Sequence, residues 1–451
     1  MGSGEVNEII KALQEWNKTK YEQPKAPSPK AYEKQVFEEI MEEGRYWTME
    51  DTGQIYMLDG GVCVPAETFL QGQIEARLDK NASNGIVREV LGHIKRNTFV
   101  SRKMFDKDPY LVNVSNGLID VIQGKFFKHS PNSQYLSLVQ LPVTYDRDAS
   151  PPKFIKFLSE IVEPADRSII MQMIGYCLLR DNRFHKAFML YGSGANGKSV
   201  LISVIRKLLG EENCSSIPLQ YFSFHRFAAA ELYKKMLNTF ADIPKKELTD
   251  TGIFKALVAG DEMIAERKGQ QPFSFTNYAK LIFSANQLPE TEDDTEGFWR
   301  RWIIVEFPNS FDEAKNVNLV SELTTDKELS GIFNLASRAL RYLIHEGGFE
   351  YNSPEMIKRK YKNMDNIFDQ FLVETCVLKP YDGTVRSKSL DIYTAYVRFC
   401  LDRKTGYYNI ENFGKKLADY GILKKRMRSG PERANVYIGI TLKQVVNQSS
   451  L

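Results

Sequence analysis

The chain has 451 residues, of which 43% are hydrophobic, and this proportion is sufficient for packed cores and excludes a disordered protein. Lysine and arginine number 60 against 57 aspartates and glutamates, and the net charge of +3 is too small to indicate nucleic-acid binding by itself. Any basic surface must therefore be local.

Cysteine usage and the N-terminal sequence bear on the compartment. The five cysteines lie far apart, without a CxxC pair or a neighbouring histidine that would indicate a zinc site. We therefore expect reduced thiols and a cytoplasmic protein. The start lacks the features of a signal peptide, and no apolar run reaches the length of a membrane span. Met1 to Gly4 have the composition of an expression scar, so we expect the native chain to begin further upstream.

The first third of the chain is predicted to hold a helix with a linker and then an α+β domain. Residues 1–30 combine helical spacing of apolar residues with the proline-rich stretch EQPKAPSPK. Residues 31–150 mix helical patterns, at 31–43 and 72–78, with short strands in YWTMEDTGQIYMLDGGVCVP and NVSNGLIDVIQGKFFKHSP.

The middle of the chain is predicted to form an α/β core. Residues 151–183 repeat apolar residues at intervals of three and four, which predicts a small helical subdomain. Residues 184–311 contain four short apolar runs, KAFMLY, KMLNTFAD, AKLIFSAN and RWIIVEF. Continuous runs are typical of strands that are buried on both faces of a parallel sheet, with helices between them.

The C-terminal part is predicted to be helical over residues 312–376 and to end in a basic domain over residues 377–451. Two helices followed by the hairpin LKKRMRSGPERANVYIGITL resemble a winged helix. We expect it to bind DNA, although a solvated charged face or a protein-binding winged helix would have the same pattern. The predicted DNA-binding residues are Lys415 and Lys416 on the second helix and Lys424, Lys425, Arg426 and Arg428 on the hairpin.

One loop carries the clearest chemistry. Residues 192–199, GSGANGKS, fit the pattern GxxxxGK[ST] between an apolar strand and an apolar helix. Such a loop turns its backbone amides around phosphate oxygens, so we expect it to bind ATP; an ordinary glycine-rich turn is the alternative. Lys198 would reach the β and γ phosphates and Ser199 would bind Mg²⁺. The predicted binding residues are Gly192, Ser193, Gly194, Ala195, Asn196, Gly197, Lys198 and Ser199.

Three later segments supply candidate catalytic residues. Asp242 ends an apolar strand, a position from which a carboxylate can bind the same Mg²⁺, although strands ending in aspartate are common. Asn286 ends the next strand and could orient water or contact the γ phosphate, or it could cap the turn before Pro289. Arg300 and Arg301 precede the last strand and could stabilise phosphate charge, or they could be a solvated or stacked pair.

The loop, the acid, the asparagine and the arginines follow one another at the ends of successive predicted strands. Together they resemble the superfamily 3 helicases, which are ring-forming ATPases of the AAA+ type. IGYCLLRDNRFHKAFMLYGSGANGKSV and FKALVAGDEMIAERKGQQPFSFTNYAKLIFSANQLPETEDDTEGFWRRWIIVEFP resemble more closely the helicase half of poxvirus, phage and plasmid primase-helicases. The resemblance covers residues 108–311 strongly and the flanks weakly.

The resemblance implies a role for each residue that matches a family motif. It implies phosphate binding by Lys198 and Ser199, a sensor role for Asn286, and an arginine finger, Arg300 or Arg301, that acts across a subunit interface. One departure is that Ala241 precedes Asp242, where family members commonly carry two adjacent acids.

The segment GDEMIAERKGQQPFSF has the signal of a β-hairpin. In the family this hairpin holds the DNA backbone in the ring channel, which would be the role of Lys268 with Arg267 beside it. A solvated surface hairpin is the alternative.

The resemblance thus implies an α/β fold: an AAA+ P-loop core with a parallel sheet, preceded by an α+β domain and followed by a winged-helix-like domain. It implies an ATP-driven, Mg²⁺-dependent DNA helicase that forms a homo-oligomer, a hexamer in the family, moves 3′ to 5′ and serves replication of a viral or mobile genome. A primase or polymerase would be a partner, and no membrane is involved. An ATP-switched initiator or loader and a P-loop kinase are the competing interpretations.

Overall fold

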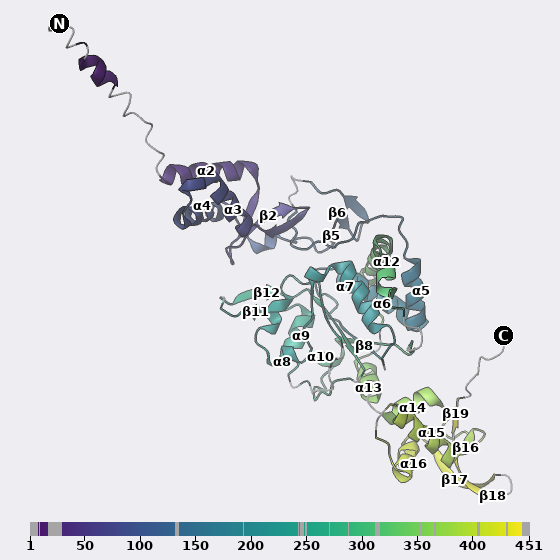
Figure 1. Ribbon diagram of the computed structural model, residues 1–451. Coiled ribbons are helices and arrows are strands. Elements are labelled where there is room, and N and C mark those ends of the chain that lie inside the picture. Colours follow the sequence, from purple (N-terminus) through teal and green to yellow (C-terminus); the bar gives the residue numbers. More distant parts are fainter. Residues whose placement is uncertain are drawn as a thin grey trace. The chain divides into compact units, whose positions relative to one another are not determined.

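The computed structural model describes residues 8–443 except 9, 17–28, 131–134, 193, 242, 244–247, 249, 270, 287, 312–315, 352, 365–366, 404–405 and 430–431. The chain divides into two compact units, Met1–Tyr145 and Asp146–Leu451, and each is described by itself (Figure 1).

The first unit is a mixed α+β region, as the sequence predicted. A four-stranded sheet has the order β3-β2-β1-β4, and a smaller antiparallel sheet has the order β5-β6-β7. Helix α4 begins after Ser83, whose side chain accepts a hydrogen bond from the amide of Ile86, and it buries Val87, Val90, Leu91 and Ile94 at helical spacing. The elements are α2 (Pro29–Glu43), β1 (Tyr46–Met49), β2 (Ile55–Asp59), β3 (Val62–Pro65), α3 (Glu67–Leu78), α4 (Asn84–Asn97), β4 (Phe99–Val100), β5 (Leu111–Val114), β6 (Gly117–Asp120) and β7 (Lys125–Phe127).

The second unit is built on a five-stranded parallel sheet with the order β14-β8-β13-β10-β9. The four predicted apolar runs form β8 (Ala187–Tyr191), β10 (Leu237–Phe240), β13 (Lys280–Ala285) and β14 (Trp302–Glu306). The sequence analysis missed β9 (Cys214–Ser215), because two residues carry no readable pattern. Every residue of β13 is buried, as expected for a strand that is covered on both faces.

Helices cover both faces of this sheet. Helices α5 (Pro152–Ile161), α6 (Pro164–Cys177), α7 (Lys198–Leu209) and α12 (Asp326–His345) form one group in Figure 1. The opposite face packs against α9 (Gly252–Ala259), α10 (Glu296–Trp299) and α13 (Pro354–Met364) in one hydrophobic core. The short helix α8 (Tyr221–Phe224) lies between β9 and β10 in the sequence, and α11 (Leu319–Leu323) follows β14.

Two further groups of elements leave the sheet. An antiparallel hairpin joins β11 (Glu262–Ala265) to β12 (Phe273–Thr276). The C-terminal residues form their own hydrophobic core and follow the predicted order of helix, helix and hairpin, with three short strands that the sequence analysis did not predict. These elements are α14 (Ile367–Thr375), β15 (Cys376–Leu378), β16 (Arg386–Lys388), α15 (Ser389–Asp402), α16 (Ile410–Asp419), β17 (Leu423–Ser429), β18 (Glu432–Ile438) and β19 (Ile440–Leu442).

Gly175 permits the close packing of α6 on α12. A Cβ atom at this position would lie against the carbonyl oxygen of Ala336 and 2.9 Å from the amide nitrogen of Leu340. Both neighbours belong to the backbone of α12, so no side-chain rotation can relieve the overlap.

We therefore expect Gly175→Ala to lower the free energy of unfolding by about 1–3 kcal/mol, because the two helices must move apart. Gly72→Ala is the matched control, since Gly72 lies in α3 with nothing within 4 Å of its added Cβ. There the same substitution should raise stability by about 0.5–1 kcal/mol through helix propensity. Urea unfolding followed by circular dichroism measures both changes. A stabilising Gly175→Ala would contradict the packing argument.

Candidate nucleotide-binding site

The glycine-rich loop lies where the sequence placed it, between β8 and α7. The backbone φ is positive at Gly194, Ala195 and Gly197, with values of 118°, 45° and 87°. A Cβ atom at Gly197 would also lie 2.6 Å from Cγ2 of Ile161, so this position needs glycine both for its φ and for space. The loop thus has the turned backbone, directly before the N-terminus of α7, that is typical of phosphate-binding loops.

Lys198, the first residue of α7, is brought into contact with Asn286. Its side chain is only 4% exposed, and the ammonium donates hydrogen bonds to the carbonyl oxygen of Gly192 at 2.6 Å and to Oδ1 of Asn196 at 3.0 Å. A third hydrogen bond, at 3.1 Å, reaches Oδ1 of Asn286. Strands β8 and β13 are parallel neighbours, so their carboxyl ends bring the two predicted residues to the same edge of the sheet.

A cavity of about 980 Å³ adjoins the loop. The loop residues 194–200 and Asn286 line one side of it, and α5 and α11 line the other. The α5 and α11 side mixes apolar with charged residues: Phe157, Ile161, Leu319 and Leu323 are apolar, and Lys153, Lys156, Glu160 and Glu322 are charged. A cavity of this size that combines apolar side chains with polar groups is typical of small-ligand sites.

The α5 and α11 wall was not predicted from the sequence. Its residues lie more than 30 positions before the loop or more than 100 after it, and no motif joins them to the loop. In the sequence, these residues showed only the amphipathic spacing that predicts a helix, and nothing that predicts a place in the site. The backbone does tie one flank of the loop in place, because the amide of Phe311 donates to the carbonyl oxygen of Ala195 at 2.8 Å.

Of the two predicted metal ligands, the structure describes Ser199 but not Asp242. Ser199 is exposed and lines the cavity. Asp242 and Ser193 lie outside the described residues, so their roles stay predictions. Strand β10, which precedes Asp242, pairs in parallel with β13 and ends at the same edge. Among the described residues, no group of three or more histidine, cysteine, aspartate or glutamate side chains could hold a metal ion without help from a ligand.

The structure separates the two candidate arginines. The guanidinium of Arg301 is 8% exposed and donates to the carbonyl oxygens of Lys255, at 3.2 Å, and Gly297. Arg300 is exposed, and its carbonyl oxygen accepts a hydrogen bond from Nζ of Lys186 at 2.6 Å. Arg301 therefore stabilises the turn between α10 and β14, and Arg300 is the one whose side chain can reach outward.

The predicted hairpin is confirmed as a structural element. Residues 268–269 form its turn, where Gly269 has a φ of 75°, and Lys268 is exposed there. The guanidinium of Arg267 lies over the rings of Phe273 and Tyr233, at 5.3 and 5.7 Å from their centroids. Arg267 is thus held against aromatic rings, whereas Lys268 projects from the turn.

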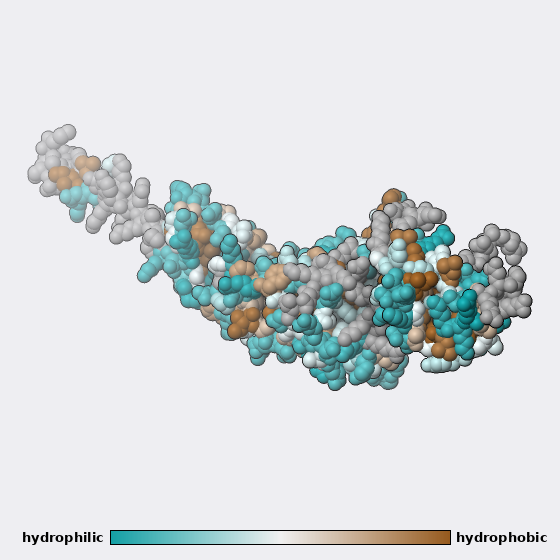
Figure 2. Space-filling model, turned by 90° about the horizontal axis from the view of Figure 1, so that it is seen from below, coloured by the Kyte–Doolittle hydropathy of each residue, from teal (hydrophilic) through white to brown (hydrophobic). Residues whose placement is uncertain are grey.

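The C-terminal basic residues also differ in how far their side chains are exposed. Lys415 on α16 and Lys424, Lys425 and Arg426 on β17 are exposed, and Lys416 is half-buried. Arg428 lies on β17 opposite Arg433, but its side chain is outside the described residues. This part also exposes apolar side chains, and Figure 2 shows brown apolar atoms over it. The exposed large hydrophobic residues of this part include Tyr381, Leu390, Leu401 and Tyr407.

The remaining sequence expectations concern cysteines and membranes. All five cysteines are buried and none of them forms a disulfide, as expected for reduced thiols. In the described part of the chain, no helix combines the length and apolar character that crossing a bilayer requires.

The chain is similar to two protein families and to several viral proteins. Residues 9–163 match the family described as D5 N terminal like, and residues 190–301 match a family of unknown function, DUF5906. A candidate helicase of Acanthamoeba polyphaga mimivirus is 25% identical over 242 residues, which are 51% of this chain and 24% of that protein. A candidate primase of African swine fever virus is 22% identical over 347 residues, which are 70% of this chain and 35% of that protein.

The chain thus spans about a quarter to a third of these two relatives, given the 24% and 35% coverage. Among solved structures, the apo C-terminal region of NrS-1 is 12% identical, covers 90% of this chain and 98% of its own, and has a TM-score of 0.49. The chain is related to viral candidate helicases and primases, and its resemblance to the primase-helicase branch of superfamily 3 is confirmed.

Proposed function

We propose that the chain is an ATP-driven DNA helicase that works as a ring in the replication of a viral or mobile genome. The observation that carries the proposal is the contact of Lys198 with Asn286 beside the turned loop. It joins the expected phosphate-binding cation to the expected sensor amide. The names of the viral relatives, a candidate helicase and a candidate primase, support the same process.

The sheet order supports an AAA+ type of core. The strand that leads into the loop, β8, lies between β14 and β13, and β13 lies between β8 and β10. Asn286 directly follows β13. This strand lies between β8, which leads into the loop, and β10, which leads to Asp242. This order brings the carboxyl ends of β8, β13 and β10 to one sheet edge, which supports the proposal that Lys198, Asn286 and Asp242 act together on a phosphate and its attacking water.

The residues of this chain fit MgATP. The bound nucleotide would supply the phosphate bond whose hydrolysis provides the energy. Lys198 neutralises negative charge at the β and γ phosphates, and Ser199 with Asp242 would hold Mg²⁺. Asn286 orients water or contacts the γ phosphate. Since Ala241 precedes Asp242, one carboxylate would serve metal and water together, and basal hydrolysis would be slow.

The exposed Lys268 supports a role in moving DNA. A lysine at a hairpin turn can contact phosphate in any sequence, which suits translocation. In a ring of six subunits, the number that the family resemblance implies, these turns would line a channel, and Arg300 would stabilise phosphate charge in the neighbouring subunit. A separate or upstream primase would supply priming.

Strand displacement on forked DNA tests this assignment. Lys198→Ala should lower ATP hydrolysis by at least about 100-fold and abolish strand displacement, because the phosphate charge loses its counter-ion. Lys268→Ala should keep basal ATPase within about two-fold and lose displacement. Both activities are measured on forks of each polarity.

Lys103→Ala is the control, because it removes an exposed lysine of the first unit that belongs neither to the nucleotide site nor to the hairpin. Lys255→Ala would be less suitable, because Lys255 forms an ion pair with Asp293.

DNA-stimulated ATPase without displacement by the wild type would instead favour an ATP-switched initiator or loader. ATP turnover that is insensitive to both DNA and Lys268→Ala would favour a small-substrate P-loop enzyme.

Alanine variants distinguish the role of Arg300 from that of Arg301. Arg301→Ala should lower the free energy of unfolding by about 1–3 kcal/mol, because the carbonyl oxygens of Lys255 and Gly297 lose their donor. Arg300→Ala should change it by less than about 0.5 kcal/mol, as is usual for exposed residues, and should lower ATPase by about 10³-fold or more.

A mixing experiment tests whether Arg300 acts between subunits. Inactive Arg300→Ala and inactive Lys198→Ala proteins, mixed in equal amounts, should regain ATPase at about a quarter of their interfaces. There, an intact Lys198 in one subunit meets an intact Arg300 in the next. Mixtures that stay inactive although the variants co-assemble would exclude a finger that acts in trans.

A further inference from the structure

A buried lysine lies at the end of β13 that is remote from the nucleotide site. Lys280 is 1% exposed, and its ammonium donates to the carbonyl oxygens of Leu179 and Tyr278, the latter at 2.7 Å. It also lies 4.5 Å from the centroid of the Tyr176 ring. Burial lowers the pKa of Lys280 to about 7, which indicates how costly the charge is at this place. A neutral side chain would have packed here without that cost.

Two buried asparagines extend these contacts to both ends of hairpin β11–β12. Nδ2 of Asn182 donates to the carbonyl oxygens of Leu257, at 2.9 Å, and Asn277, at 3.1 Å. Nδ2 of Asn277 also donates to Leu257, at 2.9 Å. Leu257 precedes β11 and Asn277 follows β12. The two asparagines are 6% and 1% exposed, so solvent does not compete for these bonds.

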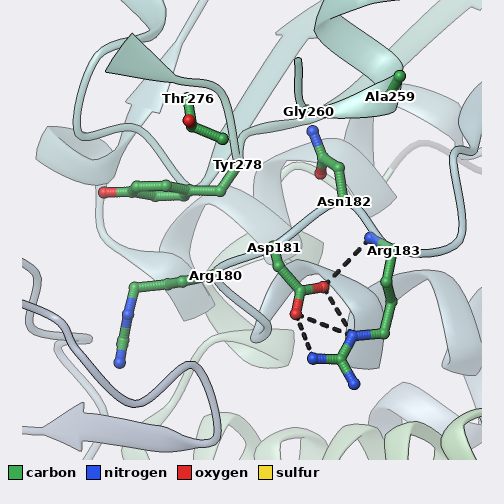
Figure 3. Close-up of a pocket in the computed structure, with 8 residues that line it drawn as sticks. All are labelled: Arg180, Asp181, Asn182, Arg183, Ala259, Gly260, Thr276 and Tyr278. Carbon is green, nitrogen blue, oxygen red and sulfur yellow. Dashed lines mark hydrogen bonds and ion pairs between the residues drawn. The ribbon is translucent and has the colours of Figure 1, made fainter. Parts of the chain in front are cut away.

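Figure 3 shows the surroundings of this network. Asn182 lies next to Gly260, the residue at which the chain turns from α9 towards β11, and a Cβ on Gly260 would lie 3.1 Å from Cβ of Asn182. Thr276 and Tyr278, at the other end of the hairpin, line the same cavity of about 520 Å³. The segment that follows α6 therefore meets both ends of the hairpin.

We propose that Lys280, Asn182 and Asn277 form a root clamp that fixes hairpin β11–β12 to the ATPase core, with Lys280 as its positioning residue. The proposal rests on the proposed helicase function, in which Lys268 of this hairpin contacts DNA. The clamp makes the hairpin follow the core as one body, and it prevents the hairpin from swinging freely about its root.

Strand β13 connects the clamp to the nucleotide site. It begins at Lys280 in the clamp, and Asn286, which directly follows it, accepts a hydrogen bond from Lys198. The strand is wholly buried and paired on both sides, so it transmits displacement with little bending. A change at Lys198 and Asn286 is thereby passed to the hairpin root over about 20 Å of strand.

Hydrogen–deuterium exchange tests the clamp without reference to activity. In Lys280→Met, the amides of residues 262–276 should exchange at least ten-fold faster than in wild type, and those of residues 198–209 should change less than two-fold. Lys235→Met is the matched control: Lys235 precedes the neighbouring strand β10, and its ammonium donates to the carbonyl oxygen of Glu212. It should leave the hairpin unchanged.

A second variant guards against misfolding of the first. Asn182→Ala keeps the buried lysine but removes both bonds to Leu257 and Asn277, and it should raise hairpin exchange at least five-fold. Equal exchange in wild type and both clamp variants would overturn the proposal. Faster exchange spread evenly over the hairpin and residues 198–209 would also overturn it, since that result describes a general core residue.

The number of ATP molecules hydrolysed per base pair separated gives the functional readout. Lys280→Met should keep basal ATPase within two-fold of wild type while the ATP consumed per base pair separated rises at least five-fold. Unchanged coupling would overturn the proposal even if the hairpin exchanges faster. If the wild type neither hydrolyses ATP nor separates strands, the proposed function fails, and the exchange result still decides whether the clamp exists.

Discussion

Burial of β13 along its whole length is the constraint on which the rest of the second unit depends. A strand that is covered on both faces and paired on both sides has no room for polar chemistry except at its ends. Asn286 follows one end and meets Lys198, while Lys280 begins the other and meets the hairpin root. The sheet therefore separates the candidate nucleotide site from the root of hairpin β11–β12 by the length of one strand, β13.

The two adjacent arginines illustrate how a turn assigns roles that the sequence leaves open. Arg301 immediately precedes β14 and points into the protein, where backbone carbonyl oxygens satisfy its guanidinium. Arg300 ends the preceding turn and stays exposed. Arginine is suited to both tasks, because it remains charged and offers donors in a fixed plane. The residue type alone could not separate the buried, structural arginine from the exposed one.

What the sequence could predict follows from how local each signal is. Continuous apolar runs predicted four of the five strands, and glycine spacing predicted the loop, because each signal lies within about ten residues. The two-residue strand β9, the strand order and the α5 and α11 wall depend on contacts between distant segments, which no local pattern records. Lys280 was overlooked for a different reason: a lysine before an apolar run is usually a solvated strand end, and only the fold buries it.

The small net charge has a consequence for how such a chain could hold DNA. With a net charge of +3, little long-range attraction is available, so binding must come from local contacts. The hairpin turn offers a single exposed lysine, since Arg267 lies against aromatic rings. One phosphate contact gives little affinity, and it weakens further as salt rises. Several copies of the hairpin around one strand would add their contacts with a high effective concentration. The proposed ring and the basic C-terminal strand therefore each supply what a lone hairpin lacks, which is why the helicase proposal requires assembly and not only ATP.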